Sequence, residues 1–222
     1  MVATCAFPEL HLPPSAGHKL RGYFGTLFRE HSPLLHNHYE DGRTRQGYPL
    51  VQYKVLGGVP TLVGLGEGAA LMSELFLRVG EITLDGRTYP VREKNLTQRR
   101  HPVGVDPDGL YEYRFQTRWM ALNQRNYAVY QEKPPAERPA LLTSILKPNI
   151  LAFFTAVGHR ESHRIVARTR LRETHTQFKN QRMLAFLGTF TTNARLPDGI
   201  GLGKSAARGY GAIRALDVPT DA

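Results

Sequence analysis

Apolar residues in the first half of the chain follow both helical and strand spacing. Leu20, Phe24 and Leu27 lie three or four residues apart, which places them on one face of a helix. Two apolar runs within residues 50–65 are separated by Gly57-Gly58, a pattern that predicts a β-hairpin. The expected elements of this half are a strand (2–7), a helix (from 14), a hairpin (50–65), a helix (66–78) and a second hairpin (81–91).

A similar set of elements is expected in the second half. Residues 99–109, rich in Pro, Gly and charge, predict a linker. Aromatic and polar residues then alternate over 111–119, as in a half-buried strand. Residues 141–157 are apolar at helical spacing, and Pro148 is expected to kink or break that helix. Strands are expected over 164–172 and 182–192.

This element order predicts an α+β protein with two domains. Each domain would hold about 100 residues, a usual domain size, and would place helices on one face of an antiparallel sheet. We place the domains at residues 1–105 and 106–222. No internal sequence repeat supports this division, so it depends on the order of elements alone.

The charge of the chain indicates an anionic partner. The 222 residues include 29 Lys and Arg against 19 Asp and Glu, a net charge of +10. Residues 1–105 hold 12 basic and 9 acidic residues (+3), whereas residues 106–222 hold 17 and 10 (+7). The basic excess therefore lies mainly in the second predicted domain.

Several classes of protein are excluded by composition. Cys5 is the single cysteine, which excludes a disulfide framework and a zinc site with several thiolates. The first residues lack the pattern of a signal peptide, and no apolar run approaches the roughly 20 residues of a membrane span. We therefore expect a cytoplasmic protein with no membrane partner.

Arginines alternate along the strand predicted at 164–172. On a strand, arginines an even number of positions apart share one face, while Ala167 and Leu171 face the other way. Guanidinium groups so close repel one another unless an anion lies across them, and arginine binds phosphate with a forked pair of hydrogen bonds. The residues of this strand predicted to bind a nucleic acid are Arg164, Arg168, Arg170 and Arg172.

Residues 199–213, GIGLGKSAARGYGAI, form a glycine-rich segment near the C-terminus. It is not a Walker A loop, because Asp198 stands where the first glycine is needed, and no GxGxxG dinucleotide pattern fits. Two Gly-x-Gly pairs five residues apart would expose backbone amides to a phosphate chain. The predicted binding residues here are Gly201, Gly203, Lys204, Ser205, Arg208, Gly209, Tyr210 and Gly211.

This paired-glycine pattern resembles the signature loop of the RAMP superfamily of CRISPR-associated RNA-binding proteins. The first half is similar to the repeat-cleaving endoribonucleases of that superfamily, in the variant found with type I-B systems. The similar stretches are LRGYFG (20–25), LLHNH (34–38) and YPLVQYKV (48–55). The resemblance implies two tandem ferredoxin-like (RRM-like) domains, in agreement with the element order above.

The resemblance also implies a reaction that needs no metal ion or other cofactor. The 2′-hydroxyl of the RNA would attack the neighbouring phosphorus, leaving a 2′,3′-cyclic phosphate and a 5′-hydroxyl. Histidine suits both proton transfers because its pKa lies near neutrality, and His36 and His38 point the same way on an extended loop. Arg29 or Lys54 would supply a cation, and Tyr48 would orient or donate a proton. Lys54 is also predicted to bind the RNA.

Alternatives remain open at this point. His31 is close enough to replace one of the two histidines, and His31, His36 and His38 with Glu40 or Asp41 would make a metal site. His159 and His163 are interpreted as surface residues without a role. A RAMP subunit that only scaffolds guide RNA and a basic ribosome-associated protein are the other functions considered. The expected partners are CRISPR repeat RNA, a CRISPR interference complex and a second copy of the chain.

Overall fold

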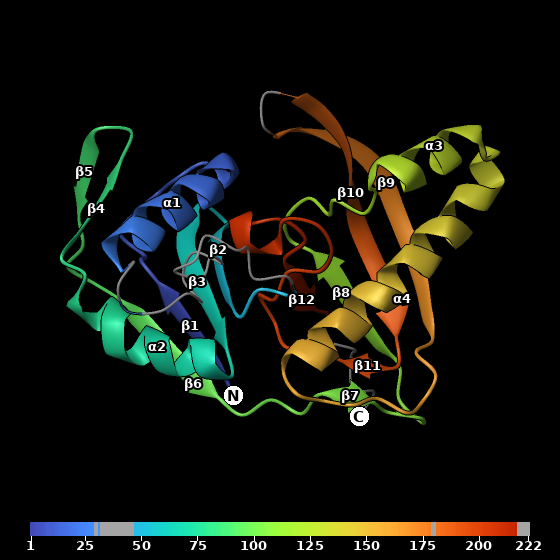
Figure 1. Ribbon diagram of the computed structural model, residues 1–222, viewed down its shortest axis with the longest axis horizontal. Coiled ribbons are helices and arrows are strands. Elements are labelled where there is room, and N and C mark those ends of the chain that lie inside the picture. The colour runs from blue at the N-terminus through green and yellow to red at the C-terminus, as the bar shows by residue number, and fades with distance from the viewer. Residues whose placement is uncertain (29–30, 32–46, 179–180, 217–222) are drawn as a thin grey trace. The chain divides into compact units, whose positions relative to one another are not determined.

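The computed structural model describes residues 1–28, 31, 47–178 and 181–216. It divides into two compact units. The first comprises Met1–His101 with Ala206–Gly209, and the second comprises Pro102–Ser205 with the residues from Tyr210 onward. Both units are antiparallel sheets with helices, which confirms the predicted α+β class (Figure 1). The four-residue segment Ala206–Gly209 is grouped with the first unit, although it lies between the two parts of the second unit along the chain.

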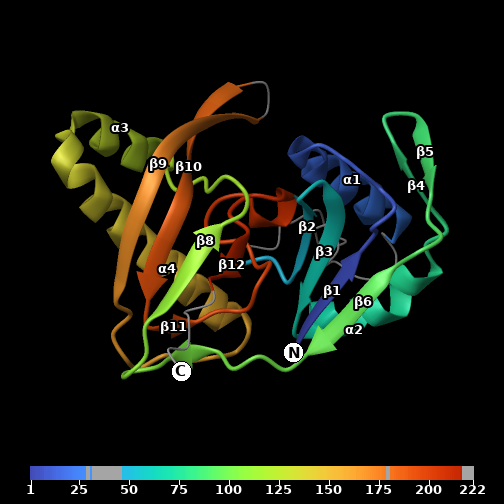
Figure 2. The same ribbon diagram turned by 180° about the vertical axis from the view of Figure 1, so that it is seen from behind.

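The first unit is built on a four-stranded antiparallel sheet. The strand order is β2 (Val51–Leu56), β3 (Val59–Leu65), β1 (Val2–Ala6) and β6 (Asn95–Arg99). Helices α1 (Gly17–Leu27) and α2 (Glu67–Leu75) cover one face, and the hairpin β4 (Glu81–Leu84) and β5 (Arg87–Pro90) forms a separate ladder (Figures 1 and 2). Short 3-10 helices precede α1 (Pro14–Ala16) and follow α2 (Phe76–Arg78).

Aromatic side chains join α1 to this sheet. Phe24 is fully buried and packs against Phe7, Tyr53 and Phe76, with ring centroids 5.0–6.2 Å apart. Burying a side chain of this size stabilises the fold by about 2–3 kcal/mol. Of the residues whose spacing predicted α1, Leu20 and Phe24 are buried, whereas Leu27 is 47% exposed.

Strand β6 was not predicted from the sequence. It pairs with β1 from Val2↔Arg99 to Ala6↔Asn95 at the edge of the sheet. Its sequence, NLTQR, is polar and mostly exposed, so it lacks the alternation that marks a half-buried strand. Backbone hydrogen bonds to β1 define this strand, rather than burial of its side chains.

The second unit also contains a four-stranded antiparallel sheet. The strand order is β12 (Ile213–Ala215), β8 (Tyr111–Phe115), β10 (Gln181–Thr192) and β9 (Ala167–Phe178). Helix α4 (Arg138–Ala156) packs on β9, and α3 (Gln124–Glu132) precedes it (Figure 1). The short strands β7 (Gly104–Val105) and β11 (Ala194–Arg195) pair with each other. The remaining 3-10 helices are η4 (Pro135–Glu137) and η5 (Ala206–Arg208), the latter grouped with the first unit.

Helix α4 runs without a break through Pro148. A proline inside a helix costs about 3 kcal/mol, but burial of one large apolar side chain returns about 1.5–3 kcal/mol. Leu146, Ile150, Phe153 and Phe154 on this helix are all fully buried. Pro135–Ala156 has the length and hydropathy of a membrane span, contrary to the expectation that no apolar stretch is long enough. Its buried face is that of a helix in the core of a domain.

Candidate catalytic loop and nucleic-acid interface

The predicted catalytic residues Arg29, His36 and His38 lie outside the residues that the structure describes, as do Glu40 and Asp41 of the alternative metal site. The chain enters this segment from the end of α1 and leaves it before β2, and these two elements pack against each other. His31 is exposed, its amide donates to the Phe28 carbonyl (3.0 Å), and its ring lies edge-on to that of Phe28. No group of His, Cys, Asp and Glu that could hold a metal occurs among the described residues.

Tyr48 lies just before β2 and is half-buried, with its hydroxyl oxygen covered by protein. It stands at the point where the chain returns from the segment that holds His36 and His38. A covered hydroxyl is better placed to orient a neighbouring group than to exchange protons with solvent. Of the two roles predicted for Tyr48, the geometry therefore favours orientation.

Lys54 is buried, in contrast to the surface contact with RNA predicted from the sequence. The side chain is fully inaccessible, and its Nζ donates to the carbonyl of Ala206 at 3.4 Å. Burial lowers the pKa of this amine to about 7. An amine in this position has no surface to offer to a phosphate. The physical reason is that η5 packs against β2, an edge strand whose residues from Val51 to Val55 are all buried.

The glycines of the C-terminal segment are required by the fold. Gly203, Gly209 and Gly211 have φ angles of +80°, +96° and +65°, a left-handed conformation that side chains disfavour. A Cβ atom at Gly203 would lie 2.5 Å from Nε1 of Trp119, and one at Gly211 would collide with the carbonyl oxygen of Leu202. Close packing explains these glycines without any ligand.

Several backbone amides of this segment already have partners. The amides of Leu202 and Lys204 donate to the carbonyls of Gly211 and Met120, at 2.9 and 3.2 Å. Those of Gly209 and Gly211 donate to Ala206 and Arg118, at 3.4 and 2.9 Å. The predicted cradle of exposed amides is therefore not formed by these four residues, because they close the segment on itself and on its neighbours. Gly201 forms a bridge with Ala212.

The side chains of the segment differ in their accessibility. Lys204 is exposed, while Ser205 and Arg208 are half-buried. The half-buried Tyr210 contacts β9, since its hydroxyl donates to the Gln177 carbonyl (3.2 Å) and lies 3.1 Å from that of Thr176. Its ring also meets Phe178 edge-on, so Tyr210 is held against the protein rather than presented to a base.

Sequence reasoning missed Arg21, a half-buried residue of α1 in the first unit. The pKa of Arg21 is lowered by burial and by the nearby charge of Arg208, which belongs to the same unit. Helix α1 also approaches η5 closely, because a Cβ atom at Gly17 would lie 2.7 Å from the Arg208 carbonyl oxygen. Two guanidinium groups thus lie near each other around η5. The stretch LRGYFG contained this arginine, but its proximity to a residue almost 190 positions away has no sequence signal.

The arginines of the predicted basic strand fall into two groups. Arg168, Arg170 and Arg172 lie on β9 and are exposed, while Thr169 between them is buried. Arg164 is exposed but precedes the strand, and its carbonyl accepts a hydrogen bond from Asn193 Nδ2. Three of the four guanidinium groups therefore share one face of the sheet of the second unit.

His159 and His163 are joined through Glu161, which the sequence analysis did not anticipate. His159 Nε2 lies 2.9 Å from one carboxylate oxygen of Glu161, and His163 Nδ1 lies 3.1 Å from the other. The Val105 amide also donates to this carboxylate, at 2.6 Å. Burial raises the pKa of Glu161, but these hydrogen bonds outweigh it and bring the pKa to about 2. The cluster ties β7 to the connection between α4 and β9.

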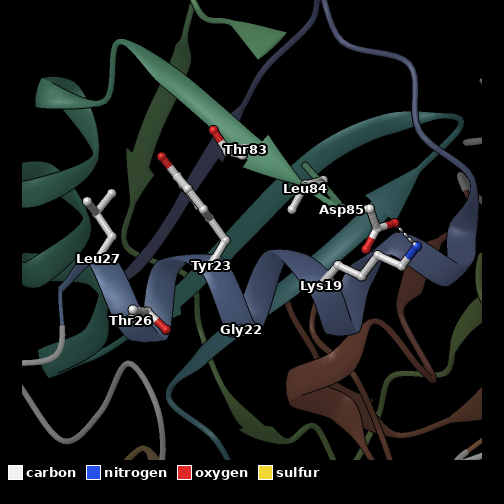
Figure 3. Close-up of a pocket in the computed structure, with 8 residues that line it drawn as sticks. All are labelled: Lys19, Gly22, Tyr23, Thr26, Leu27, Thr83, Leu84 and Asp85. Carbon is white, nitrogen blue, oxygen red and sulfur yellow. Dashed lines mark hydrogen bonds and ion pairs between the residues drawn. The ribbon is translucent and has the colours of Figure 1, made fainter. Parts of the chain in front are cut away.

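A cavity of about 480 Å³ lies in the first unit between α1 and the β4–β5 hairpin (Figure 3). An ion pair between Lys19 and Asp85 links its two walls, and Tyr23 donates a hydrogen bond to the Glu81 carbonyl beside it. None of the described residues predicted to act on RNA lines this cavity. It is therefore separate from the candidate site.

Two antiparallel-sheet domains, with an arginine-bearing strand and a closed glycine-rich segment, define a tandem ferredoxin-like protein. A family model of the Cas6b N-terminal domain matches residues 2–102, and one of the Cas6b C-terminal domain matches residues 107–216. The chain belongs to the Cas6b family of CRISPR-associated endoribonucleases.

Comparison with known proteins agrees with this assignment. A crystal structure of Cas6b is 28% identical with a TM-score of 0.92, covering 97% of this chain and 98% of that one. A Cas6b described as a CRISPR RNA processing endoribonuclease is 25% identical with a TM-score of 0.78, over the same shares. An uncharacterized protein of Methanocaldococcus jannaschii is 27% identical over 143 residues, 64% of this chain and 97% of that protein.

Proposed function

We propose that this protein cleaves CRISPR precursor RNA within its repeats, without a metal ion, and so releases guide RNAs. The observation that carries the proposal is the match of both halves of the chain to Cas6b domains, together with its likeness to a Cas6b that processes CRISPR RNA. The resemblance to repeat-cleaving enzymes around LLHNH and YPLVQYKV adds the residues for the chemistry. We expect this reaction in the cytoplasm.

In the proposed reaction, one histidine removes the proton of the 2′-hydroxyl. The 2′-oxygen then attacks phosphorus, the bond from phosphorus to the 5′-oxygen breaks, and a second histidine protonates the departing oxygen. His36 and His38 are the proposed pair, Arg29 is the proposed cation for the charged transition state, and Tyr48 is the proposed orienting group. Burial of Lys54 supports Arg29 over Lys54 in the role of cation.

The proposed RNA contacts outside the catalytic loop are side chains. Arg168, Arg170 and Arg172 are exposed on one face of the second sheet, and Lys204 is exposed in the glycine-rich segment. The half-buried Arg208 would add a charge near Arg21. Phosphate contacts of this kind hold an RNA in place without reading its sequence.

Incubation of the protein with its own repeat RNA, with and without EDTA, tests this function. We expect cutting in both conditions, with products that carry a 2′,3′-cyclic phosphate and a 5′-hydroxyl. Binding without cutting in either condition would point to a scaffolding RAMP subunit, and cutting that EDTA abolishes would point to the metal site with His31.

Variants at the two histidines test the residues. His36→Ala and His38→Ala should each abolish cutting while the RNA still binds, because the phosphate contacts lie elsewhere. The control is His18→Ala, at an exposed histidine of α1. Cutting that persists in both loop variants would refute the assignment.

Assembly with a CRISPR interference complex or with a second copy of the chain is also proposed. Light scattering after size-exclusion chromatography, with and without repeat RNA, measures the number of copies. A mass that corresponds to one chain in both conditions would contradict a homodimer.

A further inference from the structure

Three arginines from three different strands form one row across the sheet of the second unit. In the pairing register, Thr189 on β10 lies opposite Arg170 on β9 on one side and opposite Arg114 on β8 on the other. Arg114 in turn lies opposite Arg214 on β12. The row therefore crosses all four strands, over three strand spacings or about 14 Å.

The row lies on the face of the sheet opposite α4. The neighbouring row holds Thr169, Phe190 and Tyr113, which are buried. Thr169 contacts α4, since its hydroxyl lies 3.0 Å from that of Thr143 and donates to the Pro139 carbonyl. Successive residues of a strand point to opposite faces, so the arginine row points away from the helix. Figure 2 views the sheet from this open side.

The charges of the row have no ion-pair partner among the residues that the structure describes. Arg114, Arg170 and Arg214 are exposed, and Arg168 and Arg172 flank the row on β9. No ion pair in the described part of the chain includes any of these five residues. Like charges directly opposite each other on neighbouring strands, as at Arg114 and Arg214, destabilise a sheet. The fold therefore keeps an unfavourable arrangement on this face.

Two acidic residues in the described part of the chain lie near the row or at its edge strand. Glu112 is half-buried on the same face of β8, two residues from Arg114. Asp198 accepts a hydrogen bond from the Ala215 amide at 2.7 Å, at the edge strand. Among the described strand residues of this sheet, the five guanidinium groups thus share their face with one carboxylate, that of Glu112. A polyanion that follows the row would neutralise their mutual repulsion.

We infer that the open face of the second sheet binds the sugar–phosphate backbone of an RNA strand, with Arg114 and Arg214 continuing the contacts begun by Arg170. Arginine matches phosphate through forked hydrogen bonds. The residues between the arginines are Thr189, Thr191 and Leu187, with no aromatic ring for base stacking, so recognition would be of phosphate rather than of sequence. The identity of the polyanion as RNA rests on the proposed function.

The test is a double variant, Arg114→Gln with Arg214→Gln. Its control is Arg125→Gln with Arg160→Gln, two exposed arginines on α3 and in the loop after α4 that remove the same charge from other surfaces. The probe is a fluorescent repeat RNA with 2′-O-methyl riboses, which cannot be cut by 2′-hydroxyl attack. Affinity is measured by fluorescence anisotropy at several salt concentrations.

We expect the double variant to bind more weakly, and its slope of log affinity against log salt to be shallower by about 1.4, or about 0.7 for each lost phosphate contact. The control should keep the wild-type slope, and Arg114→Lys with Arg214→Lys should keep most of it. Without RNA, the double variant should be at least as stable to heat as the wild type, because a repulsion is removed.

The cutting rate at saturating protein separates this inference from the proposed function. If the double variant cuts at the wild-type rate once RNA is bound, the arginines act in binding alone, as inferred. A wild-type slope in the double variant would overturn the inference and leave the proposed function intact. A reduced rate at saturation would also overturn it, since it would place these arginines in the chemistry. If the wild type binds RNA but never cuts it, the proposed function fails while the salt slope still tests this surface.

Discussion

Lys54 places an ammonium group in the interior of the first unit, where charge is costly. Its Nζ donates to one carbonyl, that of Ala206, and burial lowers its pKa to about 7 from an ordinary value of 10.5. Between these two values the unfolded chain binds more protons at this site than the folded protein does. The free energy of unfolding should therefore rise with pH through this interval, by at most about 1.4 kcal/mol per pH unit.

Replacing this lysine by methionine should remove that dependence on pH. We expect wild-type protein to gain stability between pH 7 and pH 9, whereas Lys54→Met should change little over this range, because the buried group no longer titrates. Urea unfolding at the two pH values measures the difference. Lys204→Met, at an exposed lysine, should behave like the wild type. An equal pH response in Lys54→Met and wild type would show that the amine stays charged when buried.

At the scale of elements, the glycine-rich segment acts first as a tightly packed part of the fold. Its left-handed glycines fit where a side chain would strike Trp119 or the Leu202 carbonyl, and its amides bond to neighbouring carbonyls. A segment held in this way presents side chains such as Lys204 from a rigid backbone. That rigidity would lower the entropy lost in the proposed contact of these side chains with RNA.

Alanine substitution at two glycines should give opposite changes in stability. Gly211→Ala should lower the free energy of unfolding by about 2 kcal/mol or more, from the left-handed backbone and the collision with Leu202. Gly22→Ala should raise it by about 0.5–1 kcal/mol, because Gly22 lies inside α1 and has open space around it. Urea unfolding measures both. Normal stability with weakened RNA affinity in Gly211→Ala would instead indicate a direct role for Gly211 in binding.

At the scale of the whole molecule, the net charge of +10 acts in two opposite ways. The basic side chains repel one another in the free protein, and they attract RNA in the complex. The second predicted domain carries +7 of this charge, and three of its arginines lie side by side on β9. Salt screens both effects, so free protein and complex should respond to it in opposite directions.

Thermal unfolding over a range of salt concentrations tests this balance. As NaCl rises from about 50 to about 300 mM, the melting temperature of the free protein should rise, while the increment produced by 2′-O-methyl repeat RNA should shrink. The variant with Arg168, Arg170 and Arg172 all changed to Gln should show smaller versions of both trends. A salt response equal to that of the wild type would place the important charges elsewhere.

The sequence by itself determined the properties that depend on neighbouring residues. Helical spacing identified two buried residues of α1, Leu20 and Phe24, although Leu27 of the same set is exposed. Alternation identified the exposed arginines of β9, and motif spacing led to the family that the Cas6b domain models show. These signals are local, because a side chain's direction along a helix or strand follows from backbone geometry alone. The polar edge strand β6 has no such signal and was missed.

Only the tertiary structure decided which residues far apart in the sequence are neighbours in space. Lys54 is buried because η5, about 150 residues later, packs on β2, and Arg114 meets Arg214 because β12 pairs with β8. The sequence shows each of these cations but not its environment. The register of strands and the packing of distant segments are set by the cooperative burial of the core, and this burial determines which arginines share a surface and which lysine loses contact with water.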